Sequence, residues 1–100
     1  MAHYENEALG VSFDVADRIT VRQQLAFRSD LSRRDEGGLF ARYWKAAPAI
    51  VTNWQCALIL DMTGVDLDAV DDPRVTDVIV WTADTVAGHM AGLETPEKKS

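Results

Sequence analysis

Two long segments of this chain repeat apolar residues at helical spacing, one on each side of an acidic, turn-rich connection. Within residues 39–60 the repeat runs through Phe40, Trp44, Ala47, Val51, Trp54 and Leu58. Within residues 73–94 it runs through Val75, Ile79, Thr82, Val86, Met90 and Leu93. A helix with such a stripe is stable in water only when the stripe is covered, so both segments are predicted to be helices that share one core.

Local signals set the bounds of three predicted helices: 20–31, 39–60 and 73–94. The first begins with a capping box, in which Thr20 and Gln23 satisfy each other's backbone amides. The second contains Pro48, which removes an amide donor and predicts either a kink or a break into two helices. The stripe keeps its phase across the proline, which favours the kink. The third begins with Asp72 as N-cap and Pro73 at the first helical position.

The rest of the chain predicts little regular structure. Apolar and polar residues alternate over residues 11–16, which indicates a short extended arm laid against the core. Residues 1–10 and 96–100 are predicted to be disordered tails. We therefore expect an all-α domain over residues 11–95, a small bundle of three main helices with the second kinked at a proline. Its expected core is Leu25, Phe40, Trp44, Val51, Trp54, Leu58, Val75, Ile79, Val86 and Met90.

The charge of the chain limits its partners. The formal net charge is −6, and residues 61–72 hold five aspartates and no base. Such a surface repels phosphates, so the sequence predicts no nucleic-acid binding. No run approaches the roughly 18 apolar residues of a membrane span. A single cysteine, Cys56, cannot form an internal disulfide, which favours the cytoplasm.

The aspartates and the few nucleophilic or metal-binding side chains do not form a recognisable catalytic or metal site. A calcium loop that starts at Asp66 would have valine at its fifth position and aspartate where glycine is required. Cys56 lies between two residues of the apolar stripe, which indicates a packing thiol rather than a nucleophile. His3 and His89 have no further ligands at suitable spacing. We therefore expect no catalytic residue, no cofactor and no metal.

Two features predict a surface for a protein partner. Trp81 lies off the stripe of the third helix, on the side that holds Gly88 and Gly92. A glycine inside a helix costs up to about 1 kcal/mol relative to alanine, so two of them indicate close approach of another helix. That helix belongs either to the same molecule or to a partner or second copy, and both interpretations stay open. The predicted acidic part of the surface is Asp66, Asp68 and Asp71.

Several stretches of the chain resemble small tail assembly chaperones of actinobacterial tailed phages. The resemblance is carried by residues 13–25, 43–47, 51–56 and 72–81, which read FDVADRITVRQQL, YWKAA, VTNWQC and DPRVTDVIVW. It implies a small, acidic, mostly helical protein without enzymatic activity, in the cytoplasm of an infected bacterial host. Such chaperones bind the tape-measure protein and keep it soluble while tail protein polymerises around it. The resemblance assigns no individual residue a role.

Two other functions fit the same sequence. One is an acidic phage-encoded inhibitor of a host defence enzyme, which would compete for a basic nucleic-acid groove. The other is a structural virion subunit at the head–tail junction. The position of the gene, beside a tape-measure gene or in a variable early operon, separates the chaperone from the inhibitor.

Overall fold

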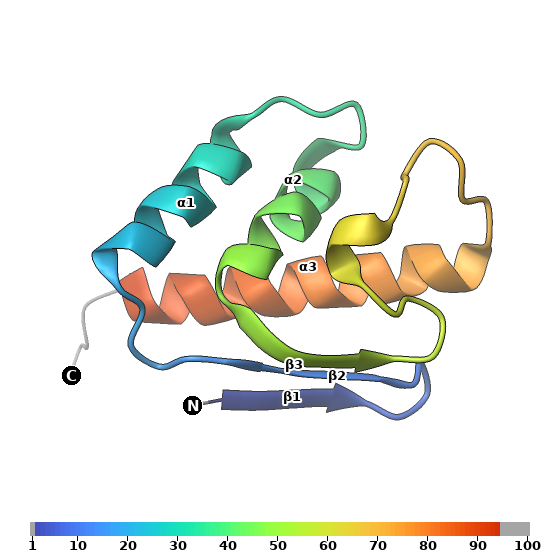
Figure 1. The fold of residues 1–100 in the computed structure, drawn as a ribbon, viewed down its shortest axis with the longest axis horizontal. Helices are drawn as coiled ribbons and strands as arrows, with labels where there is room; N and C mark the ends of the chain where they lie inside the picture. The colour runs from blue at the N-terminus through green and yellow to red at the C-terminus, as the bar shows by residue number, and fades with distance from the viewer. Residues whose placement is uncertain (1, 95–100) are drawn as a thin grey trace.

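Three antiparallel strands form a sheet whose one face is covered by helices (Figure 1). The computed structural model describes residues 2–94. The elements follow in the order β1 Ala2–Asn6, β2 Val11–Val15, α1 Val21–Ser32, α2 Gly38–Ala46, η1 Ala47–Ala49, β3 Val51–Cys56, η2 Met62–Gly64 and α3 Pro73–Glu94. The prediction of an all-α bundle is therefore wrong, and the fold is α+β.

The central strand of the sheet is β2, with β1 on one side and β3 on the other. The residues predicted to be an extended arm are this strand, and its apolar residues Val11, Phe13 and Val15 all lie in the core. Residues 2–6 belong to the predicted N-terminal tail, but they pair with β2 as an edge strand. Gly10, at φ +68°, supplies the left-handed conformation of the turn between the two strands. The predicted tail at residues 96–100 lies outside the described residues.

The strand β3 replaces the second half of the predicted kinked helix. It pairs with β2 through Val15↔Val51 and Val11↔Cys56, and it has one residue more than β2 between these pairs. The extra residue forms a bulge, where Asn53 has a φ of 55°. The bulge allows Val51 and Trp54 to pack toward the core although they are three residues apart. A bulged strand therefore imitates the three-residue step of a helix, which explains the wrong prediction.

Pro48 ends the helix rather than kinking it. Helix α2 stops at Ala46, and one 3₁₀ turn, η1, leads into β3. In this turn the amide of Ile50 donates to the carbonyl oxygen of Ala47 at 3.0 Å, so the turn closes although Pro48 has no N–H. The β-branched residues Val51 and Thr52 follow at once and favour a strand.

The other two helices confirm their predictions. Both hydrogen bonds of the capping box at Thr20 and Gln23 are present at the start of α1. Asp72 accepts the backbone amide of Arg74 at 2.9 Å at the start of α3. Both helices begin within one residue of the predicted positions because these caps are local interactions.

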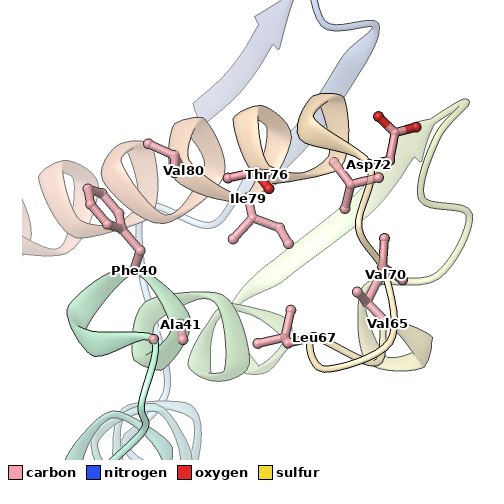
Figure 2. Close-up of a pocket in the computed structure, with 11 residues that line it drawn as sticks. Phe40, Ala41, Val65, Leu67, Val70, Asp72, Thr76, Ile79 and Val80 are labelled. Carbon is pink, nitrogen blue, oxygen red and sulfur yellow. The ribbon is translucent and has the colours of Figure 1, made fainter.

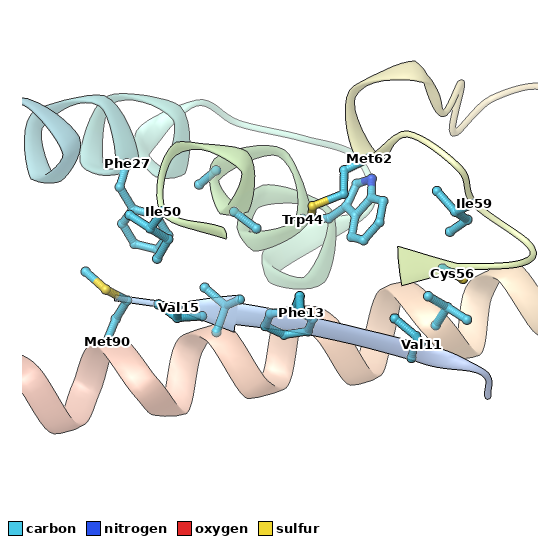
Figure 3. Close-up of a cluster of buried hydrophobic side chains, with 14 of the residues drawn as sticks. Val11, Phe13, Val15, Phe27, Trp44, Ile50, Cys56, Ile59, Met62 and Met90 are labelled. Atoms are coloured by element: carbon cyan, nitrogen blue, oxygen red, sulfur yellow. The ribbon is translucent and has the colours of Figure 1, made fainter. Parts of the chain in front are cut away.

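The core is organised around Phe13, which is fully buried between the helices and the sheet (Figure 3). The rings of Tyr4, Trp54 and Trp81 lie with centroids 5.7, 5.9 and 5.6 Å from that of Phe13. Of the expected core residues, four are buried and four are partly buried against the core: Trp44, Val75, Val86 and Met90, then Val51, Trp54, Leu58 and Ile79. Leu25 and Phe40 are exposed, so their assignment to the core is wrong.

A pair of substitutions at Asn53 tests the bulge. Asn53→Ala and Asn53→Gly both remove the hydrogen bond that Asn53 Nδ2 donates to Asp14, but only alanine places a Cβ at positive φ. Left-handed backbone costs an L-residue roughly 1–2 kcal/mol, so we expect the glycine variant to be more stable by about 1 kcal/mol in urea unfolding. An alanine variant as stable as the glycine variant would contradict the bulge.

Candidate partner-binding groove

An apolar groove lies between α2, α3 and the segment that leads into α3 (Figure 2). Its volume is about 270 Å³. The apolar lining, which we call the α2–α3 groove, consists of Phe40 and Ala41 from α2, Val65, Leu67 and Val70 from the segment, and Val75, Ile79 and Val80 from α3. Its lining is apolar and open to solvent at Phe40, Val70 and Val80, which suits the side chains of a docked protein.

The segment of residues 65–72 forms one wall of the groove because its residues divide between two sides. Val65, Leu67 and Val70 line the groove, whereas Asp66, Asp68 and Asp71 are exposed to solvent. The carboxylate of Asp66 accepts the amide of Asp68 at 3.0 Å, and the Asp66 carbonyl accepts the amides of the two residues that follow Asp68. These bonds fold the segment into a turn and leave an acidic rim beside the apolar lining.

The rim is strongly negative. Residues 61–77 hold six aspartates and one arginine, Arg74. That arginine is already engaged, since its Nη2 lies 2.8 Å from Oδ2 of Asp72 at the end of the groove. Hydrogen bonds from the Arg74 side chain and backbone amide lower the pKa of Asp72, so this carboxylate stays ionised. The groove therefore presents uncompensated negative charge to a partner, which favours a basic one.

The lining of the groove is not fully covered by the fold. Phe40, Val70 and Val80 are 49%, 45% and 37% exposed. Large apolar side chains gathered in a hollow on the surface mark a contact site more often than scattered ones do. A partner that covers them would remove apolar area from water, which is the main source of affinity in such contacts.

Trp81, Gly88 and Gly92 lie along one side of α3, at steps of seven and four residues. Trp81 packs edge-on against Phe13 and lies partly buried beneath the sheet. Gly88 and Gly92 are exposed, and a Cβ added to either would meet no atom within 4 Å. Close approach by another helix of the same molecule therefore does not explain these glycines. Their contact with a partner stays a prediction, while Asp66, Asp68 and Asp71 lie on the groove wall.

Cys56 and His89 hold structural positions. Cys56 is buried at the end of β3. His89 links α3 to β1 and to the end of β2. Its Nδ1 lies 2.7 Å from the hydroxyl of Tyr4, and its Nε2 lies 3.2 Å from the carbonyl oxygen of Ala16. The carbonyl can only accept, so Nε2 donates to it. Within residues 2–94, no three histidine, cysteine, aspartate or glutamate side chains gather as ligands for a metal ion.

A polar cluster lies on the outer face of the sheet, opposite the helices. His3 Nδ1 lies 2.6 Å from Oδ1 of Asp14, and Asn53 Nδ2 donates to Oδ2 of the same aspartate at 2.7 Å. The hydrogen bond to Asp14 raises the pKa of His3. Hydrogen bonds from Asn53 and then from His3 lower the pKa of Asp14. The cluster joins all three strands, and these two pKa shifts predict that its contribution to stability depends on pH.

Substitution of His3 reveals this pH dependence. Asp14 stabilises the fold above its ordinary pKa of 3.8 and loses that effect as pH falls through its lowered folded value. His3 stabilises the fold below its ordinary pKa of 6.5 and loses that effect as pH rises through its raised folded value. We expect the stability difference between the wild type and His3→Ala to be largest between the ordinary pKa of Asp14, 3.8, and the ordinary pKa of His3, 6.5. Urea unfolding at several pH values measures it, and a difference that is constant with pH would contradict the ion pair.

Comparisons with known proteins do not identify a family for this chain. No family model, curated protein or solved structure matches this chain. Among residues 2–94, none of the helices combines the length and the apolar character that crossing a bilayer requires. The α2–α3 groove with its acidic rim is therefore the feature from which a function has to be inferred.

Proposed function

We propose that this protein is a non-enzymatic binding protein that holds an amphipathic helix of a partner protein in the α2–α3 groove. The observation that supports this proposal most directly is the exposed apolar lining beside the acidic rim. A helix laid into such a groove inserts apolar side chains spaced one turn apart. Basic residues that flank the apolar stripe of the partner helix would then lie beside Asp66, Asp68 and Asp71.

The lining and the rim have different roles in this proposal. Burial of one large apolar side chain contributes about 1.5–3 kcal/mol. An exposed ion pair contributes about 0–1 kcal/mol and weakens as salt screens it. Apolar contacts therefore hold the partner helix, and the aspartates mainly speed and orient its approach.

The resemblance to tail assembly chaperones makes the tape-measure protein of a tailed phage the proposed partner. In that role the groove covers an apolar stripe of a long helix until tail protein polymerises around it. The site of action is then the cytoplasm of the infected bacterial host. An exposed stripe would otherwise associate with other copies, so covering it keeps the tape-measure protein soluble.

Co-expression with the tape-measure protein of a tailed phage tests the groove, with substitutions at two neighbouring residues of α2. Phe40→Asp places a charge in the lining, and we expect it to weaken binding by roughly tenfold to a hundredfold, the loss of one buried side chain. Leu39→Asp is the matched control, because Leu39 is also exposed on α2 but does not line the groove. An aspartate in the first turn of a helix is favourable for folding. We expect soluble tape-measure protein with the wild type and Leu39→Asp, and much less with Phe40→Asp.

Two results, from two experiments, would contradict the proposal. One is a tape-measure protein that stays soluble to the same extent with Phe40→Asp as with the wild type. The other comes from a pull-down from infected cells. Recovery of a host nuclease or nucleotide-sensing enzyme, without any tail protein, would support the inhibitor function instead.

A triple change, Asp66→Asn with Asp68→Asn and Asp71→Asn, separates the rim from the lining. Asparagine keeps the side-chain oxygen that accepts the Asp68 amide, so the turn is retained. We expect the association rate with the partner helix to fall and to lose most of its salt dependence, while the dissociation rate changes little. Stopped-flow measurements at low and high salt provide both rates. A large rise in dissociation, with little change in association, would mean that the aspartates hold the partner rather than guide it.

A further inference from the structure

A second apolar surface on this molecule lies on α1. Val21 and Leu25 are 70% and 63% exposed and stand one helical turn apart. Together with Arg22 and Ala26 they line a shallow hollow, which we call the α1 patch. Helix α1 packs on the core through Phe27, which is buried, so the patch faces solvent. Within residues 2–94, neither the sheet nor the other helices cover the patch.

The α1 patch and the α2–α3 groove carry opposite charge. Helix α1 holds two basic residues, Arg22 and Arg28, and one acidic residue, Asp30, and Arg22 borders the patch. Residues 61–77, which include the groove wall, hold six acidic and one basic. The patch thus has the chemistry that the groove is expected to select: apolar side chains at i and i+4 on a helix, flanked by arginine.

We propose that α1 of a second copy of this chain occupies the α2–α3 groove when no partner helix is bound. Val21 and Leu25 of one copy insert against the lining, and Arg22 lies beside the aspartates of the wall. This inference rests on the proposed function, because it takes the groove as a site for amphipathic helices. It adds regulation of that site: a partner helix must displace α1, so empty grooves are covered until a partner arrives.

The arrangement of the two surfaces determines the form of the assembly. Helix α1 and the start of α3 lie toward opposite ends of the long axis (Figure 1), so the α1 patch is separated from the aspartates that precede α3 in the same copy. A copy that inserts α1 into its neighbour therefore keeps its own groove open for the next copy. Such head-to-tail contacts continue beyond two copies. A contact made by one short helix is small and reversible, which allows a longer partner helix to replace it.

Sedimentation measurements over a range of concentrations test this assembly with three variants. Leu25→Asp disables the patch but leaves the groove intact, and Phe40→Asp disables the groove but leaves the patch intact. Leu60→Asp is the control, because Leu60 is highly exposed and borders neither surface. We expect the wild type and Leu60→Asp to grow with concentration to more than two copies, and each of the other variants alone to stay monomeric.

Mixing the two disabled variants gives the sharpest result. One has an intact groove and the other an intact patch, so the mixture should form a complex of one copy of each and stop there. Circular dichroism first confirms that every variant is folded. A wild type that stays monomeric, or a mixture that stays monomeric, would overturn the inference.

Binding of the partner helix by the same variants keeps this inference separate from the proposed function. Leu25→Asp should bind the partner helix at least as tightly as the wild type, because no second copy competes for the groove. Loss of binding only in Phe40→Asp, combined with a monomeric wild type, would retain the proposed function and overturn self-association. Self-association as described, combined with full partner binding by Phe40→Asp, would overturn the proposed function.

Discussion

Burial of Phe13 is the constraint on which the rest of the structure depends. This side chain projects from the central strand and contacts Tyr4 from β1, Trp54 from β3 and Trp81 from α3. It thereby fixes one side of α3 against the sheet. The other side of α3 is left to pack with α2 and with the segment of residues 65–72. The groove is the part of this second contact that the side chains of the described residues, 2–94, do not fill.

The parts of the fold that local interactions determine could be predicted from the sequence. The caps at Thr20 and Asp72 fix the starts of α1 and α3 without reference to the rest of the molecule. The sheet depends on pairing between residues distant in the chain, and no single strand signals its partner. β1 is polar at alternate positions, so its sequence predicts a tail. The bulge at Asn53 gives the apolar residues of β3 the spacing of a helix.

The sequence predicts only part of the candidate site, because its acidic residues form a local pattern whereas its apolar lining depends on tertiary packing. The aspartates of residues 66–71 were identified from charge alone, because an acidic run without bases is visible in sequence. Phe40 was assigned to the core from its phase in an apolar stripe, and only the tertiary position of α2 shows that it lines a groove. Trp81 is predicted to belong to a partner surface, and the structure shows that its ring also packs against Phe13 of β2. A stripe shows that a face must be covered but does not show by which element.

The central claim is that a partner helix binds in the α2–α3 groove, and methyl NMR with the isolated partner helix tests it most directly. The methyl groups of Leu67, Val70, Ile79 and Val80 line the groove, and those of Leu60 and Val11 lie outside it. The account predicts that titration of the helix shifts the four groove residues and leaves the other two unchanged. Binding that shifts none of the groove methyls, and instead perturbs the amides of Gly88 and Gly92 or of the outer sheet face, would contradict it.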